Sequence, residues 1–263
     1  MTGIERIEKQ FASKKKIKLM THVVGGYPDM QTCEKMVLLM AQKGVDLVEI
    51  QLPFSDPIAD GPVIVHANHA ALNAGVTTES VLSMLESVRA KVDIPLLIMS
   101  YINPLFAHGI ESFVERVKSI DLDGLIIPDC PPEDMEINLP ALCNAAGLAF
   151  VPLIAPTTPE DRMAFLVKKS LSPFVYAVLR LGVTGRKTEL DTDTVAYLKK
   201  IKDTTKRFVA AGFGIRGKDQ LDALIGHVEC GIIGSALLKA VNKAINAESD
   251  PIKAADEFLD RLA

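Results

Sequence analysis

The sequence contains no tryptophan, and aromatic residues make up only 5% of its 263 residues. The core therefore has to be built mainly from aliphatic side chains. The only cysteines, Cys33, Cys130, Cys143 and Cys230, lie far apart and form no CxxC pair. This pattern favours neither a disulfide framework nor a cysteine-ligated zinc site, and we expect a cytoplasmic protein in a reducing environment.

The sequence also lacks an excess of basic charge and any long apolar run. Lys and Arg number 29 against 33 Asp and Glu, which gives a net charge of −4 and argues against a nucleic-acid-binding protein. The basic run at 14–16 is interpreted as a solvated segment before the first strand. No apolar stretch reaches the roughly 18 residues that a membrane span needs, and the N-terminus is typical of a short amphipathic helix and not of a signal peptide. The sequence therefore predicts neither a nucleic-acid partner nor membrane insertion.

What the chain does have is a regular alternation of short apolar runs and segments of helical period. Eight runs are typical of strands, and each is followed by a helical pattern. The predicted strands cover 19–24, 46–52, 94–101, 124–129, 148–154, 173–179, 207–212 and 229–234. The main predicted helices cover 33–40, 62–73, 78–91, 110–119, 133–146, a segment opened by Thr158 and Pro159, 191–203, 217–226, 236–246 and 251–262. Repeated β-then-α units indicate right-handed crossovers and a parallel sheet.

Eight such units in a chain of this length favour an α/β fold, a closed (β/α)8 barrel, also called a TIM barrel, with an extra N-terminal helix and a C-terminal helix. A doubly wound open sheet is the alternative. No linker or change of composition divides the chain, so we expect one domain over residues 1–263. In such a barrel the chemistry lies on the loops after the C-terminal ends of the strands.

The end of the second predicted strand carries an unusual carboxylate. Period-two alternation places Leu47, Glu49 and Gln51 on one face, and the opposite face of this strand is continuously apolar. The apolar face should pack under the helices, so Glu49 should point into the barrel. An isolated buried carboxylate is costly, so Glu49 is expected to be paired, hydrogen-bonded or protonated. We predict a functional role for it, with a structural ion pair as the alternative.

The loop that follows this strand contains two aspartates. Asp56 lies between Ser55 and Pro57, and Asp60 precedes Gly61. Either could be catalytic, and either could be a turn residue or the N-cap of the next helix, because Asp serves both structural roles well.

Glycine-rich loops follow three later strands. The loop at 181–187 has two glycines and is either a surface loop or a loop that approaches a ligand. The segments at 212–214 and 234–235 each lead into a helix. Barrel enzymes often hold a phosphate between the two last loops, on N–H groups at a helix N-terminus, so a phosphorylated substrate is predicted.

The histidines carry little information. His66 and His69 lie three residues apart on a predicted helix with no third ligand nearby in sequence, so no metal site is expected. His22 is predicted to lie inside the barrel on the first strand and could line a pocket.

The segment VEIQLPFSDPIADGP at 48–62 closely resembles the signature of tryptophan synthase alpha subunits. The resemblance spans nearly the whole chain and includes MSYINPLFAHGIESF, IIPDCPPED, GVTG, GFGI and IIGSAL in family order. It implies cleavage of indole-3-glycerol phosphate to indole and glyceraldehyde 3-phosphate by a retro-aldol reaction without cofactor or metal. It also implies a pyridoxal-phosphate-dependent beta subunit as partner, in an alpha2beta2 assembly.

The resemblance also implies roles for individual residues. Glu49 matches the general acid/base, and Asp60 matches the carboxylate that binds the indole N–H. Thr184 lies in the loop that closes over the site. The phosphate cradle corresponds to Gly185, Gly214, Gly234 and Ser235. Positions in or beside the indole pocket are Tyr101, Tyr176, Phe213, Ile64 and Ile126. Pro53 and Asp56 match a region that faces the partner.

Several residues depart from the family pattern, namely His22, Val24, Tyr27, Gln51, Leu179 and Leu181. These departures motivate a second hypothesis, a free-standing indole-releasing lyase. A third is a non-catalytic regulatory subunit, against which the presence of both Glu49 and Asp60 argues. A fourth, a sugar-phosphate isomerase or epimerase, would explain the phosphate loops but not the segment at 48–62.

Overall fold

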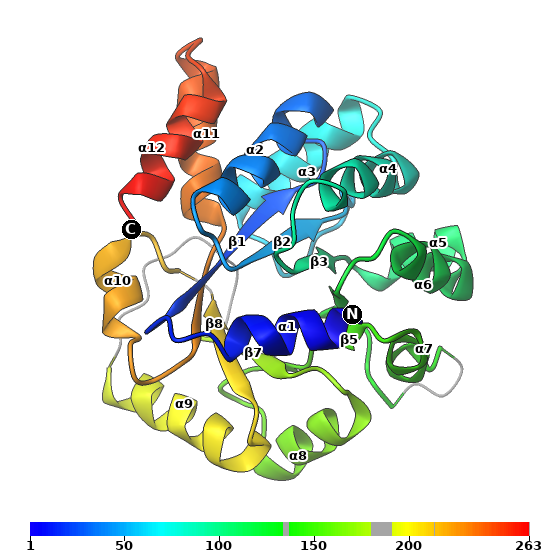
Figure 1. Ribbon diagram of the computed structural model, residues 1–263, viewed down its shortest axis with the longest axis vertical. Helices are drawn as coiled ribbons and strands as arrows, with labels where there is room; N and C mark the ends of the chain where they lie inside the picture. Colours follow the sequence, from blue (N-terminus) through cyan, green and yellow to red (C-terminus); the bar gives the residue numbers. More distant parts are fainter. Residues whose placement is uncertain (134–136, 180–190, 213, 263) are drawn as a thin grey trace.

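A computed structural model describes residues 1–133, 137–179, 191–212 and 214–262. Its parallel strands curl into a barrel with helices around the outside (Figure 1). The strands are β1 (Lys18–Val24), β2 (Leu47–Gln51), β3 (Leu96–Met99), β4 (Gly124–Ile126), β5 (Ala149–Phe150), β6 (Leu153–Ile154), β7 (Phe174–Val178), β8 (Phe208–Gly212) and β9 (Cys230–Ile233). The helices are α1 (Gly3–Phe11), α2 (Met30–Gln42), α3 (Pro62–Asn73), α4 (Thr78–Arg89), α5 (Ile102–His108), α6 (Ile110–Ser119), α7 (Leu139–Ala146), α8 (Glu160–Lys169), α9 (Thr192–Thr205), α10 (Lys218–Ala223), α11 (Ser235–Asn246) and α12 (Pro251–Asp260).

The sheet closes through one extended segment that pairs with a different neighbour at each end. The strand order is β5-β4-β3-β2-β1-β9-β8-β7-β6, and β5 and β6 are two parts of the single strand predicted at 148–154. The backbone N–H of Val151 donates to the carbonyl of Leu125 in β4, whereas the carbonyl of Pro152 accepts from the N–H of Tyr176 in β7. Pro152 has no N–H to donate, which explains why regular pairing breaks there. The closed α/β barrel is therefore confirmed, with one predicted strand divided in two.

The strands separate two apolar regions, because successive side chains point to opposite faces. The inner region fills the barrel and includes Leu47, Leu97 and Phe174. The outer region, under the helices, includes Val48 and Ile50. The alternation predicted for the second strand is thus confirmed, and it is this alternation that places Glu49 on the inner side.

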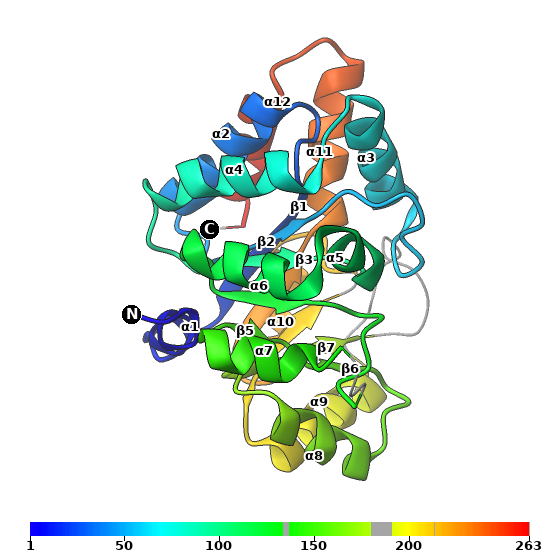
Figure 2. The ribbon, with the colours of Figure 1, turned by 90° about the vertical axis from the view of Figure 1, so that its right-hand side faces the viewer.

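Helix α1 closes the end of the barrel at which the strands begin. Figure 2 shows α1 end-on at one side of the barrel, away from α3 and α5, which follow the C-terminal ends of β2 and β3. Phe11 stacks on Phe174 and Phe208 with ring centroids 5.1 and 5.0 Å apart. Arg6 forms an ion pair with the buried carboxylate of Asp123. The backbone here is so close that a Cβ on Gly3 would lie 2.5 Å from the Cα of Asp123. The N-terminal helix is therefore part of the barrel core.

We expect Phe11→Ala to lower the free energy of unfolding by about 3–5 kcal/mol, because the variant leaves a cavity among the rings under α1. The matched control is Phe106→Ala, since Phe106 is 54% exposed on α5 and should contribute less than about 0.5 kcal/mol. Urea unfolding of both variants measures the difference. Equal losses of unfolding free energy in the two variants would show that α1 does not close this end of the barrel.

Some local predictions were wrong. The N-cap of α8 is Pro159 and not Thr158, because the hydroxyl of Thr158 accepts a hydrogen bond from the backbone of Ala155 instead. Helix α5 was not predicted. Helix α7 begins at Leu139, later than the predicted 133, and residues 134–136 lie outside the described part of the chain.

Among the described residues, no helix combines the length and the apolar character that a membrane crossing requires. The C-terminal helix α12 packs against α11 and α2 on the outside of the barrel.

Candidate active site

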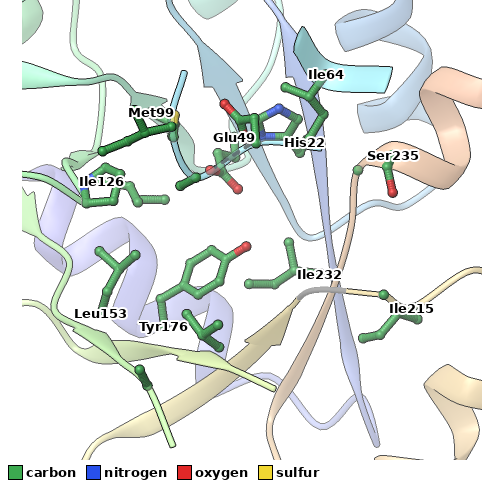
Figure 3. A pocket seen from close by; sticks show the side chains of 18 of the residues that line it. His22, Glu49, Ile64, Met99, Ile126, Leu153, Tyr176, Ile215, Ile232 and Ser235 are labelled. Carbon is green, nitrogen blue, oxygen red and sulfur yellow. Dashed lines mark ion pairs between the residues drawn. The ribbon is translucent and has the colours of Figure 1, made fainter. Parts of the chain in front are cut away.

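A cavity of about 500 Å³ opens at the C-terminal ends of the barrel strands (Figure 3). Its lining combines two carboxylates and a histidine with an apolar wall. The lining residues are His22, Glu49, Ile58, Ala59, Asp60, Ile64, Met99, Ile126, Pro128, Leu153, Ala155, Thr158, Tyr176, Val178, Gly214, Ile215, Ile232, Gly234 and Ser235. This is the end of the barrel at which the sequence predicted the chemistry.

Glu49 enters the cavity from β2, beside His22 of β1. The two residues are register partners in the parallel β1–β2 pair, and His22 Nδ1 lies 3.4 Å from Glu49 Oε1. Glu49 is 3% exposed, and its second oxygen, Oε2, has no hydrogen-bond partner among the described residues. A buried carboxylate oxygen without a partner inside a ligand-sized cavity is well placed to exchange a proton with a bound molecule.

The His22 ring supplies the positive charge beside Glu49. Burial disfavours the charged ring, but Glu49, and then Asp60 and Gln51, outweigh this effect and raise the pKa of His22 above its ordinary value. The ring is therefore protonated more readily than an ordinary histidine, and in that form it places a positive charge beside Glu49.

Asp60 lies in the loop after β2, in a different environment from Glu49. Its Oδ2 accepts hydrogen bonds from Gln51 Nε2 at 2.7 Å and from the Tyr101 hydroxyl at 3.0 Å. The Tyr101 hydroxyl in turn accepts from the backbone N–H of Ala59 at 3.0 Å. Burial raises the pKa of Asp60, while His22, Gln51 and Tyr101 act in the opposite direction. The carboxylate is held in place from behind and faces the cavity, and Gly61 occupies the N-cap of α3.

Asp56, the other aspartate of this loop, lies outside the cavity. It is exposed and accepts a hydrogen bond from the hydroxyl of Ser55. The structure therefore separates the two aspartates that the sequence alone left open.

Most of the remaining cavity wall is apolar and forms an apolar slot. Figure 3 shows Tyr176 across the cavity from Glu49, with Met99, Ile126 and Leu153 on one side and Ile232 on the other. Tyr101 lies behind Asp60 and packs on Phe54, with ring centroids 5.4 Å apart, and it acts on the cavity through its hydrogen bonds to Asp60 and Ala59. The slot fits a planar aromatic molecule.

Backbone groups dominate one end of the cavity, where α11 begins. Gly234 is the N-cap of this helix, and no side chain caps it, so the N–H groups of the first turn face the cavity end. A Cβ on Gly234 would lie 3.0 Å from His22 Cβ, and Gly214 has φ +109°, a conformation that favours glycine. The N–H groups at such a helix start bind anions.

Comparison with known proteins then places the chain in a family. The model of the family "Tryptophan synthase alpha chain" matches residues 9–262. The alpha chain of Desulforapulum autotrophicum is 36% identical over 260 residues, covering 99% of this chain and all of that protein. That of Syntrophotalea carbinolica is 38% identical over 231 residues, covering 88% and 90% of the two chains.

The chain belongs to the tryptophan synthase alpha chain family.

Solved structures of the family superimpose on nearly the whole chain. The subunit alpha of Legionella pneumophila tryptophan synthase has a TM-score of 0.90 at 28% identity, covering all of this chain and 97% of that one. A tryptophan synthase chain from Mycobacterium tuberculosis has a TM-score of 0.84 at 26% identity, covering 99% and 95%. The family provides the indole-3-glycerol-phosphate lyase component of tryptophan synthase, a carbon–carbon lyase of tryptophan biosynthesis.

The structure brings together most of the residues that the family resemblance named. Glu49, Asp60, Tyr176, Ile64 and Ile126 line the cavity, as do three at the anion-binding end, Gly214, Gly234 and Ser235. Thr184, Gly185 and Phe213 lie outside the described residues, as does Leu181.

The departures from the family pattern divide into two groups. His22 and Gln51 lie beside the two carboxylates. Val24 and Leu179 belong instead to the outer apolar region. The hydroxyl of Tyr27 donates a hydrogen bond to Oδ1 of Asn242 at 2.7 Å. Of the five departures that the structure describes, the first group alone can act directly on the chemistry of the cavity.

Several lining residues were not identified from the sequence, notably Met99, Leu153, Thr158, Val178, Ile215 and Ile232. Met99 could have been found by extending the alternation from Glu49, because the two lie on neighbouring strands with the same inner face. No sequence signal distinguishes Leu153 or Ile232 from an ordinary core residue.

Proposed function

We propose that this chain performs the family's reaction as a retro-aldol cleavage, in which indole-3-glycerol phosphate yields indole and glyceraldehyde 3-phosphate. The observation that carries the proposal is the pair of buried carboxylates in one cavity. Glu49 has an unpartnered oxygen and lies beside His22, and Asp60 is held by two donors. The apolar slot between them and the helix start accommodates the indole ring, and the N–H groups at Gly234 and Ser235 donate hydrogen bonds to the phosphate.

The chemistry needs proton transfers and charge stabilisation only. A proton is delivered to the indole ring carbon that bears the glycerol chain, which leaves positive charge on the ring nitrogen. A proton is then removed from the adjacent hydroxyl, the carbon–carbon bond breaks, and its electron pair returns to the ring. The products are neutral indole and an aldehyde. We assign the proton transfers to Glu49 and the stabilisation of the nitrogen, through its N–H, to Asp60.

The remaining site residues are proposed to bind substrate. Tyr176, Ile64 and Ile126 contact the indole ring, and Tyr101 fixes Asp60. Thr184, Gly185 and Phe213 keep the roles that the family resemblance implies.

We further propose that the chain works with a tryptophan synthase beta subunit in an alpha2beta2 assembly. Asp56 is exposed in the loop after β2 and can contact a partner, and Ile58 of the same loop is 76% exposed. Pro53 is buried, so its part in the interface is to shape this loop.

We place the assembly in the cytoplasm and treat residues 1–263 as one domain.

A comparison of rates tests the partnership. The purified chain is incubated with indole-3-glycerol phosphate, alone and with a tryptophan synthase beta subunit, and indole is measured. We expect indole in both conditions and a faster rate with the partner. Equal rates would favour a free-standing lyase, and activity only in the partner's own reaction would favour a regulatory subunit.

A further inference from the structure

Two buried polar atoms near the carboxylates are not accounted for by the roles assigned above. Among the described residues, His22 Nε2 and Gln51 Oε1 have no hydrogen-bond partner. His22 is 6% exposed, and Gln51 is fully buried. A buried polar atom without a partner costs free energy, so a pair of such atoms with complementary chemistry calls for an explanation. A ring nitrogen that carries a proton is a donor, and the amide oxygen is an acceptor.

The strand register brings these two side chains to the same place. In the β1–β2 pair, His22 lies opposite Glu49 and Val24 lies opposite Gln51. His22 is therefore a diagonal neighbour of Gln51 on the inner face of the barrel. With about 3.3 Å of rise per residue and about 4.8 Å between strands, such neighbours lie about 8 Å apart at Cα, within reach of a histidine and a glutamine side chain.

We propose that His22 and Gln51 are positioning residues that join the two carboxylates of the site into one hydrogen-bonded unit. In this unit, which rests on the proposed function, Nδ1 of His22 holds Glu49. The two unpartnered atoms are not bonded to each other in the structure, and a small rotation of the side chains lets Nε2 of His22 donate to Oε1 of Gln51. The amide nitrogen of Gln51 donates to Asp60, as it already does at 2.7 Å.

The charges around the ring support this arrangement. The titratable groups that face His22 are Glu49 from β2 and Asp60 from the loop after β2, and Tyr176 shares the cavity from β7. From β9, the strand on the other side of β1, the cavity receives only Ile232 and then Gly234. Glu49, Asp60 and the Gln51 side chain all raise the pKa of His22, although its burial acts in the opposite direction. When it is protonated, the ring therefore carries its positive charge next to both carboxylates.

The unit has a consequence for the reaction. It occupies Glu49 Oε1 and Asp60 Oδ2, the atoms that face His22 and Gln51, and it leaves Glu49 Oε2 open to substrate. If either bridging residue is replaced, the unit is broken and neither carboxylate is held in its orientation by it. The effect should therefore fall on kcat, with KM for indole-3-glycerol phosphate nearly unchanged.

A double-mutant cycle tests the coupling. The variants are His22→Phe, which keeps a ring, and Gln51→Met, which keeps the length of the side chain. We expect each single variant to lower kcat about tenfold, and the double variant to lose little more than either single one, because both break the same unit. Losses that multiply to about a hundredfold in the double variant would overturn the proposal.

Histidine NMR supplies a readout that is independent of activity. The protein has five histidines, and the His22 signals are assigned by their absence in His22→Phe. We expect His22 in the unmodified chain to titrate above the ordinary pKa of a histidine, and to titrate at lower pH in Gln51→Met. The matched control is His66→Phe, in which an exposed histidine of α3 outside the cavity is replaced and His22 should titrate as before.

The two measurements separate failure of this proposal from failure of the proposed function. An unchanged His22 titration in Gln51→Met would show that the two side chains do not interact, whatever the chain catalyses. A shifted titration in a chain that releases no indole would instead leave the hydrogen-bonded unit standing and refute the lyase assignment.

Discussion

Replacing Glu49 by glutamine is expected to reduce kcat for indole release by about 10²–10⁴-fold, the contribution typical of a positioned general acid/base. Glutamine has nearly the same shape as glutamate. It can neither deliver the proton that the ring carbon gains nor accept the proton that the hydroxyl loses. The apolar slot and the helix start at Gly234 are unaffected, so the dissociation constant for indole-3-glycerol phosphate should change little. Single-turnover indole release and equilibrium binding measure the two quantities separately.

The control for this variant is Glu115→Gln. Glu115 is exposed on α6, outside the cavity, and its replacement should leave both quantities at the values of the unmodified chain. Near-normal turnover in Glu49→Gln would show that the buried carboxylate of β2 is a structural partner of His22 and that the proton comes from another group.

Asp60→Asn is the second variant for which we expect a large effect, a loss of about 10²-fold or more in kcat, since it removes a preorganised negative charge next to the ring nitrogen. The asparagine oxygen can still accept from Gln51 and Tyr101, so the loop after β2 should keep its position. The loss should therefore come from missing charge and not from misfolding. Asp203→Asn, at an exposed position of α9, is the matched control.

The pH dependence gives this prediction a second test. Burial raises the pKa of Asp60, so its carboxylate is lost at a higher pH than for an ordinary aspartate. The rate of the unmodified chain should fall as the pH drops through the pKa of this group, and Asp60→Asn should lack that part of the profile. If the variant kept both the rate and the acidic limb of the pH–rate profile, Asp60 would be a turn residue without a catalytic role.

Much of the fold follows from local pattern. Alternation along 46–52 separated the inner from the outer face of β2 and put Glu49 inside the barrel, as the structure confirms. The break of the fifth strand at Pro152 could also have been anticipated, because proline cannot donate to a neighbouring strand. Helix α5 was missed because a proline, Pro104, lies within its first turn, where a helix tolerates it but where the residue also marks loops.

The site was only partly predictable, because it depends on which residues of different strands lie opposite each other. The sequence contains both His22 and Gln51, but the register of β1 against β2 decides that they lie beside Glu49 and Asp60. The apolar wall presents the same difficulty. Ile232 lines the cavity, and Ile233, one residue later on the same strand, belongs to the outer core.

The most direct test of the account is to measure both products from indole-3-glycerol phosphate with the purified chain and no added cofactor. The absence of tryptophan from the sequence means that indole fluorescence can be followed without a protein tryptophan background. We predict that indole and glyceraldehyde 3-phosphate appear in equal amounts and that both disappear together in Glu49→Gln. Failure of the unmodified chain to form indole, alone or with a beta subunit, would contradict the assignment of this cavity as a lyase site.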